Sequence, residues 1–163
     1  MNELGVVLML WLLPLRLHPV SVGGSAPIAP VEVKPEIALQ EITDDLRMRL
    51  EITERITVTL VDHNPLLMSV ETLGGRVGPF VITVDRDFIS ELGHDEISAA
   101  VAHELGHVWI YTHYPYLQTE RMANEVAMRV INRSAFEPVY EKVWRRTGIR
   151  GNLAEFIGPG NQQ

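Results

Sequence analysis

The sequence predicts an α+β domain with one N-terminal helix, a small three-stranded sheet and then a series of helices. Two observations carry this prediction. Apolar residues recur at helical spacing at the start and in the second half of the domain, and three short β-branched segments lie between them. Strands and helices that are segregated along the chain are typical of α+β proteins. The length of 163 residues is that of a single domain.

The first predicted helix spans Glu36–Ile56. Apolar side chains recur there at roughly helical spacing: Ile37, Ile42, Leu46, Leu50 and Ile56. Three strands are predicted over Thr57–Val61, Met68–Leu73 and Phe80–Val84, because these segments are short, apolar and rich in β-branched residues. Turn-forming residues separate them. The last of the three strands is the most hydrophobic.

The second half of the domain is predicted to be helical. A short helical turn over Asp87–Leu92 ends at a glycine. The next helix spans Asp95–His113 and ends before Pro115, because proline cannot continue a helix. Further helices are predicted over Thr119–Arg133 and Glu137–Arg146.

The two ends of the chain are predicted to lie outside this domain. Residues 1–26 are predicted to be a signal peptide, because small residues follow an apolar run at 4–15 that is shorter than the about 20 residues of a membrane helix. Residues 27–35 form a proline-rich linker, 36–157 the domain, and 158–163 a disordered tail. The protein is expected to be exported (periplasmic or secreted) if the first segment is a signal peptide, and cytoplasmic otherwise.

The composition restricts the classes of function. The formal net charge of −7 argues against a nucleic-acid partner, because phosphate binding needs a basic surface. The chain has no cysteine, so a metal site would be built from His, Asp and Glu. No apolar run has the length of a stable transmembrane span. The sequence specifies no oligomeric state.

The pentapeptide HELGH at positions 103–107 has the form H-E-x-x-H. Residues four apart on a helix share a face, so His103 and His107 can bind one metal ion. Every other side chain from 99 to 110 is apolar or glycine, so three ionisable groups would be buried at high cost unless a cation partnered them. The pattern predicts a zinc site in which Glu104 is the general base that takes a proton from water.

A catalytic zinc ion has three protein ligands, so a third ligand must lie elsewhere in the chain. Glu120 is the preferred candidate, because it shares a helical face with small and apolar residues that can pack on the metal-binding helix. His113 has the spacing of the last histidine in H-E-x-x-H-x-x-G-x-x-H, but Ile110 replaces the glycine that turns the chain. Glu125 has an arginine four residues away on either side and is expected to form surface ion pairs.

HELGH followed by Glu120–Asn124 (ERMAN, of the form E-x-x-A-N) resembles the two motifs of the gluzincin metallopeptidases. The segment Ile82–His107 is similar to the branch that includes the prenyl-protein endopeptidases, and the asparagine in the second motif is similar to the ImmA/IrrE-type peptidases. The resemblance implies a minimal zincin-like domain, in which the H-E-x-x-H helix is followed by a helix that carries the third ligand. It implies that Glu120 binds zinc with the two histidines, and that Asn124 supports the first histidine without binding the metal.

The sequence therefore predicts a zinc-dependent peptidase that hydrolyses peptide bonds in a peptide or protein substrate. The alternative is a catalytically inactive zinc-binding domain that serves as an interaction or sensor module, and the intact Glu104 counts against it. In the resembled families an edge strand beside the motif pairs with substrate, so substrate is expected to add a strand along Phe80–Val84. The residue that stabilises the oxyanion is left open among four candidates that follow the metal-binding motif: Tyr111, His113, Tyr114 and Tyr116.

Overall fold

The computed structural model describes residues 35–74, 78–149 and 151–159. The predicted signal peptide, the predicted linker except for Pro35, and residues 160–163 of the predicted tail lie outside the described residues. The described residues form six α-helices, one 3-10 helix and a three-stranded sheet. The predicted α+β class is confirmed.

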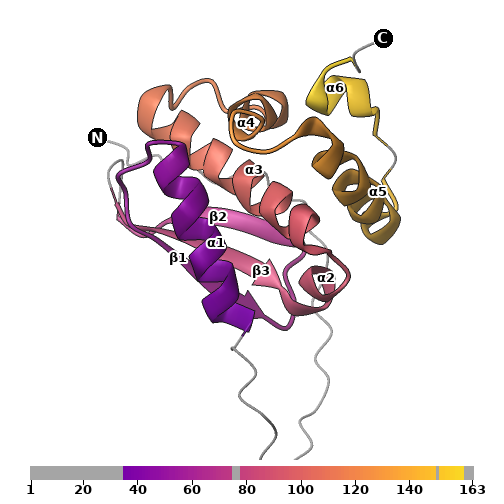
Figure 1. The fold of residues 1–163 in the computed structure, drawn as a ribbon, viewed down its shortest axis with the longest axis horizontal. Helices are drawn as coiled ribbons and strands as arrows, with labels where there is room; N and C mark the ends of the chain where they lie inside the picture. The colour runs from indigo at the N-terminus through magenta and orange to yellow at the C-terminus, as the bar shows by residue number, and fades with distance from the viewer. Residues whose placement is uncertain (1–34, 75–77, 150, 160–163) are drawn as a thin grey trace, which may run out of the picture. The chain divides into compact units, whose positions relative to one another are not determined.

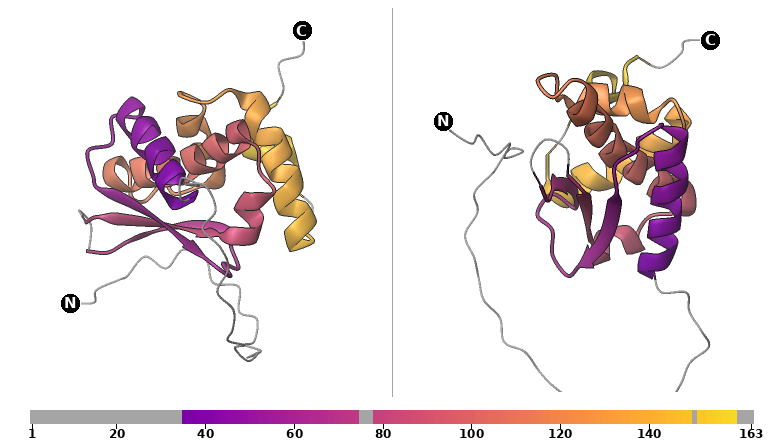
Figure 2. Two further views of the ribbon diagram at one scale, coloured as in Figure 1. Left: turned by 60° about the horizontal axis from the view of Figure 1, so that its bottom comes forward. Right: turned by 90° about the vertical axis from the view of Figure 1, so that its left-hand side faces the viewer.

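The elements follow the predicted order, with one further helix near the end of the chain. They are α1 (Pro35–Arg49), β1 (Ile56–Val61), β2 (Met68–Thr72), β3 (Phe80–Asp85), α2 (Arg86–Ser90), α3 (His94–His113), α4 (Glu120–Ala127), the 3-10 helix η1 (Arg133–Ala135), α5 (Phe136–Thr147) and α6 (Leu153–Ile157). Helices α1 and α3 lie side by side across one face of the sheet, and α4, α5 and α6 lie beyond α3 (Figure 1). The left view of Figure 2 shows the sheet with these helices on one side of it.

The sheet has the strand order β1-β3-β2. Its central strand β3 pairs in parallel with β1 and antiparallel with β2, where Val70 lies opposite Ile82. The expectation that Phe80–Val84 is an edge strand that receives substrate is therefore wrong. The apolar residues of this strand reflect burial of one of its faces instead, since Ile82 and Val84 are both 0% exposed. Of the two edge strands, β2 has the more extensive contact with α3.

Helix α3 runs through the middle of the domain, in contact with α1, β2, α4 and α5. Most of its apolar side chains between 99 and 110 are buried, as the sequence predicts: Ala99, Ala100, Val101, Ala102, Leu105, Val108 and Ile110. Among the helices of the described residues, none is both long and apolar enough to cross a membrane. The three ionisable side chains within this buried part of α3 are those of His103, Glu104 and His107.

Helix α1 is shorter than predicted. It ends at Arg49 because Glu51 takes a left-handed backbone conformation with φ of 58°, and the N–H of Ile52 donates to the carbonyl of Arg47 at 3.0 Å. Ile56, whose spacing suggested a continued helix, is instead the first residue of β1 and is buried there. Ile56 is apolar because it belongs to the core, and not because a helix continues to it.

The C-terminal half also differs from the prediction. Helix α4 ends at Ala127, well before the predicted end at Arg133, and the chain then turns into η1. Helix α6 was not predicted, because its five residues are too few to show a periodic pattern. Its start is marked by Asn152, whose Oδ1 accepts from the N–H of Ala154 at 3.1 Å.

Candidate metal centre

Helix α3 places His103 and His107 on the same face, one turn apart. Their Nε2 atoms lie 3.2 Å from each other. The two rings are nearly perpendicular, with centroids 4.8 Å apart. Two imidazole nitrogens therefore face one point in space from the middle of a buried helix.

Helix α4 crosses α3 at Gly106, between the two histidines in sequence. A Cβ atom on Gly106 would lie 2.9 Å from the Cα of Ala123, so only glycine permits this approach of the two backbones. Glu120, the first residue of α4, then reaches both histidines. Its Oε2 lies 3.2 Å from His103 Nε2, and its Oε1 lies 3.5 Å from His107 Nε2.

His103, His107 and Glu120 could hold a metal ion. Each offers one ligand atom, and these three atoms lie within 4.8 Å of one another. His107 is buried, whereas the side chain of Glu120 is 52% exposed, so the group is reached by solvent from the Glu120 side. Two imidazole nitrogens and one carboxylate oxygen are a donor set that suits catalytic zinc, so the residues present fit that ion.

The other two ligand candidates lie elsewhere. Helix α3 continues through Ile110 to His113, whose ring stacks on Trp109 at 4.1 Å and whose Nδ1 lies 2.8 Å from the Trp109 carbonyl. Glu125 is exposed and pairs with Arg121 at 2.9 Å. The predicted ion pair between Glu125 and Arg129 is not found among the described residues, because α4 ends at Ala127, before Arg129.

Glu104 lies beside this group without belonging to it. Its side chain is buried at 6% exposure, and it accepts a hydrogen bond from the backbone N–H of Val70 in β2. Burial raises the pKa of Glu104 to about 7, and the charge of Glu120 acts in the same direction, while His103 and the Val70 hydrogen bond oppose the rise. The carboxyl group can therefore exchange a proton near neutral pH.

The two histidines differ in their affinity for protons. Burial lowers the pKa of His103, but its hydrogen bond to Glu120 and the charge of Glu104 outweigh burial and raise the pKa to about 9. The pKa of His107 is lowered by burial and by the charge of His103. The hydrogen bond from His103 also lowers the pKa of Glu120. In the absence of metal, the proton of the group is therefore held between His103 and Glu120.

Both histidines are held from behind by amide side chains. The Nδ1 of His103 lies 2.9 Å from Oδ1 of Asn124, the residue for which the family resemblance implied this contact. The Nδ1 of His107 lies 3.0 Å from Oε1 of Gln118, in the loop before α4. Gln118 was not predicted, because a single glutamine in a loop carries no pattern that marks it as part of a site.

The chain is only distantly similar to known proteins. No protein-family model and no curated protein matches the sequence. Among solved structures, it is similar to the metallopeptidase zymogen of Pyrococcus abyssi abylysin, with 17% sequence identity and a TM-score of 0.46. The similarity covers 70% of this chain and 99% of that chain. It assigns no role to any residue of this chain.

A tyrosine from α5 also belongs to the surroundings of the site. The hydroxyl oxygen of Tyr140 accepts from Asn124 Nδ2 at 2.5 Å. Burial and the charges of Glu120 and Glu104 raise its pKa above the usual range.

The four residues that were candidates for stabilising the oxyanion do not gather at the ligand group. Tyr111 packs edge-on against Phe80, His113 stacks on Trp109, and Tyr114 and Tyr116 are exposed in the loop.

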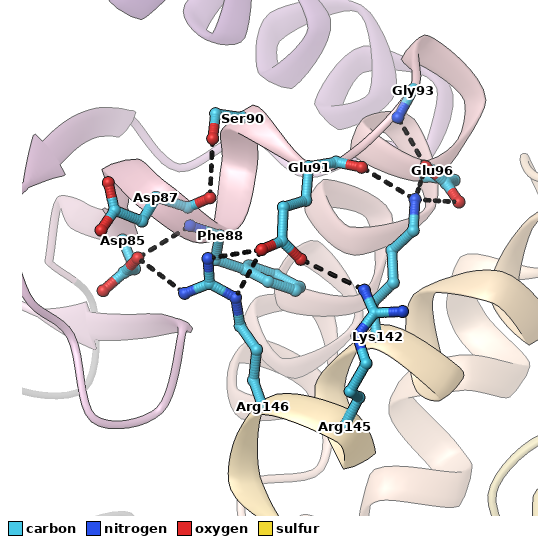
Figure 3. Close-up of polar contacts among 10 residues, drawn as sticks. All are labelled: Asp85, Asp87, Phe88, Ser90, Glu91, Gly93, Glu96, Lys142, Arg145 and Arg146. Carbon is cyan, nitrogen blue, oxygen red and sulfur yellow. Dashed lines mark hydrogen bonds and ion pairs between the residues drawn. The ribbon is translucent and has the colours of Figure 1, made fainter.

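Helix α5 is tied to α2 and α3 by a group of ion pairs (Figure 3). Lys142 Nζ lies 2.6 Å from Glu96 Oε2 and donates to the carbonyl of Glu91 at 2.8 Å. Arg146 pairs with Glu91 at 2.8 Å and with the buried Asp85 at 3.7 Å. These contacts fix α5, which carries Tyr140, against the start of the metal-binding helix.

Proposed function

We propose that the protein is a zinc-dependent peptidase that hydrolyses peptide bonds in peptide or protein substrates. His103, His107 and Glu120 would hold the zinc ion, and Glu104 is the general base. The observation that carries the proposal is the convergence of two imidazole nitrogens and one carboxylate beside a buried carboxylate that is not part of the ligand group. The intact acid beside the ligands supports an enzyme over an inactive interaction or sensor module.

The ligand group suits catalysis more than a structural role. Three protein ligands leave a coordination position for water or substrate, whereas structural zinc sites are closed by four. Solvent reaches the ligand group, because the side chain of Glu120 is 52% exposed. When bound, zinc polarises the carbonyl group of a peptide bond and lowers the pKa of water.

Glu104 moves the proton. Burial raises the pKa of Glu104 in the metal-free chain, and a carboxylate at this position can accept a proton from the attacking water and return it to the leaving amine. The N–H of Val70 holds the carboxylate in place from the edge of the sheet.

We propose that an extended substrate pairs with β2. The backbone hydrogen bonds that flank the β2–β3 pair involve Leu67 and Leu73, and in an antiparallel pair such bonds recur at every second residue. The main chain of Val70 therefore faces away from β3, toward Glu104. A substrate strand added along this edge would carry its backbone past the general base.

The first test is cleavage of a denatured protein by the purified chain, with and without a chelator. We expect chelation to abolish cleavage and added zinc to restore it. Cleavage that persists at full rate after the metal has been removed would exclude a metal-dependent peptidase.

Zinc content after dialysis against a mild chelator tests the ligand set. Glu120→Ala should lose the metal, because it removes a ligand. Glu125→Ala and His113→Ala should retain it, because both residues lie outside the ligand group. If His113→Ala empties the site and Glu120→Ala does not, the proposed ligand set is wrong.

A further inference from the structure

The amides of Gln118 and Asn124 each join a histidine to a backbone carbonyl. Asn124 has its Oδ1 on His103 Nδ1, and its Nδ2 donates to the carbonyl of Phe156 at 3.0 Å. Gln118 has its Oε1 on His107 Nδ1, and its Nε2 donates to the carbonyl of His107 at 3.0 Å. A carbonyl oxygen can only accept a hydrogen bond, so the NH₂ group of each amide must face it. The amide oxygen of each residue must then face the histidine.

This orientation sets the proton on each imidazole ring. An amide oxygen only accepts, so Nδ1 of both His103 and His107 carries a hydrogen. The nitrogen that remains for a metal is Nε2, and the two Nε2 atoms are the ones that face each other and Glu120. The rings are therefore turned so that both Nε2 atoms face the position of a metal, which takes the place of the proton that His103 shares with Glu120.

We infer that Gln118 and the backbone carbonyl of Phe156 are positioning elements of the metal centre, which orient two amides and thereby direct both Nε2 atoms at the metal. This inference rests on the proposed function of the site as a metal centre. It gives a role to α6, which lies far from the H-E-x-x-H motif in sequence and ends at Ile157. The end of this short helix supplies a fixed acceptor to the amide behind the first metal ligand.

Helix α6 is held firmly enough to fill this role. Its last carbonyls are taken by side chains, that of Phe156 by the fully buried amide behind His103 and that of Ile157 by Arg133. The Phe156 ring packs on Tyr140 at 5.2 Å and on Trp144 at 6.1 Å. Both aromatic residues belong to α5, which the ion pairs of Figure 3 fix against α2 and α3.

The inference explains why an amide, and not a carboxylate, stands at position 124. An aspartate would accept from His103 Nδ1 at least as well as asparagine does. Its second oxygen, however, would face the carbonyl oxygen of Phe156 with no hydrogen between them. The same holds for a glutamate at position 118 against the carbonyl of His107.

The test is the zinc affinity of Asn124→Asp and Gln118→Glu in the full chain, measured by competition with a chelator. We expect each variant to bind zinc about 10- to 100-fold more weakly than the wild type. If the residues served only as acceptors for Nδ1–H, the carboxylates would hold or raise the affinity, and that result would overturn the inference. Gln118 is only partly buried and lies in a loop, so Gln118→Glu should fold even if Asn124→Asp does not, and it then carries the test.

Gln40→Glu is the matched control. Gln40 also donates a hydrogen bond from its amide to a backbone carbonyl, that of Ile56 at 3.0 Å, but this contact joins α1 to β1 and involves neither histidine. Its replacement should lower the unfolding midpoint and leave the zinc affinity unchanged. A loss of zinc affinity as large as that of the other two variants would show a general loss of stability and would overturn the inference.

A second measurement needs no metal. In the metal-free protein, at a pH high enough for both rings to be neutral, histidine ¹⁵N–¹H spectra should show Nδ1–H on both rings. Asn124→Ala and Gln118→Ala should each give a mixture of tautomers at the ring they contact. An Nε2–H form in the wild type would contradict the inference. If the wild type shows Nδ1–H but binds no zinc, the proposed function fails and the positioning of the rings stands.

Discussion

Zinc should bind more tightly as the pH rises, because the metal must displace a proton from His103. The pKa of this histidine is about 9, since the hydrogen bond to Glu120 and the charge of Glu104 outweigh the effect of burial. Below that pH, one proton is released for each metal bound, so the affinity should change about tenfold per pH unit, or roughly 1.4 kcal/mol. At about pH 7 the affinity should therefore be on the order of 100-fold below its value above the pKa.

The assay is competition with a chelator of known affinity between about pH 6 and about pH 8, corrected for the protonation of the chelator. Two variants distinguish the effect of the buried Glu104 charge on His103 from a general effect of negative charge. Glu104→Gln keeps every proposed ligand but removes a charge that raises the pKa of His103, so the pH dependence should level off at a lower pH. Glu125→Gln removes a charge of the same sign from an exposed position on α4 and should leave the slope unchanged. A wild-type affinity that is flat or falls over this range would refute the reasoning.

The stability of the metal-free protein should change in the opposite direction. A raised histidine pKa stabilises the fold fully below the unfolded value of about 6.5 and loses that contribution as the pH rises through about 9. The raised pKa of Glu104 acts in the same sense at lower pH, because ionisation of this buried acid costs more in the folded than in the unfolded chain. The lowered pKa of His107 opposes this trend below the unfolded histidine value of about 6.5, so urea unfolding of the metal-free protein should show a midpoint that falls from about pH 7 to about pH 9.

Two further predictions concern the edge strand and α5. Val70→Pro removes the N–H that meets Glu104 and should lower turnover at least about tenfold with zinc retained. Val58→Pro, in the other edge strand, should cleave normally when folded, and equal losses in the two variants would argue against substrate on β2. Lys142→Met should destabilise the fold by about 1–2 kcal/mol in denaturant unfolding, because Lys142 is 22% exposed and holds Glu96 and a helix-end carbonyl. Arg145→Met, whose side chain is 66% exposed, should change stability by less than about 0.5 kcal/mol, and a larger loss there than at Lys142 would contradict this view.

Local pattern was sufficient for much of the fold. The β-branched segments and the long apolar helix were placed within a residue or two of their ends, because burial sets their sequences directly. The central position of β3 in the sheet could not be predicted from local pattern. Its sequence indicated a strand and the family resemblance favoured an edge strand, but the structure places it at the centre of the sheet.

The site was partly readable for a similar reason. The structure brings Glu120, and not His113 or Glu125, to the two histidines, which follows from the apolar face of α4 and the close crossing at Gly106. Gln118 and the carbonyl of Phe156 could not be read, because their contacts depend on where a loop and a distant short helix come to lie. A backbone carbonyl leaves no trace in residue type.

The most direct test of the central claim is the zinc content and cleavage rate of Glu104→Gln, measured on the same sample. The variant removes the proposed base and no proposed ligand, so it should keep about one zinc ion per chain and lose at least about 100-fold in rate. A variant that cleaves at the wild-type rate would contradict the assignment of Glu104 as the base. A variant that loses its zinc would contradict the separation of Glu104 from the ligand group.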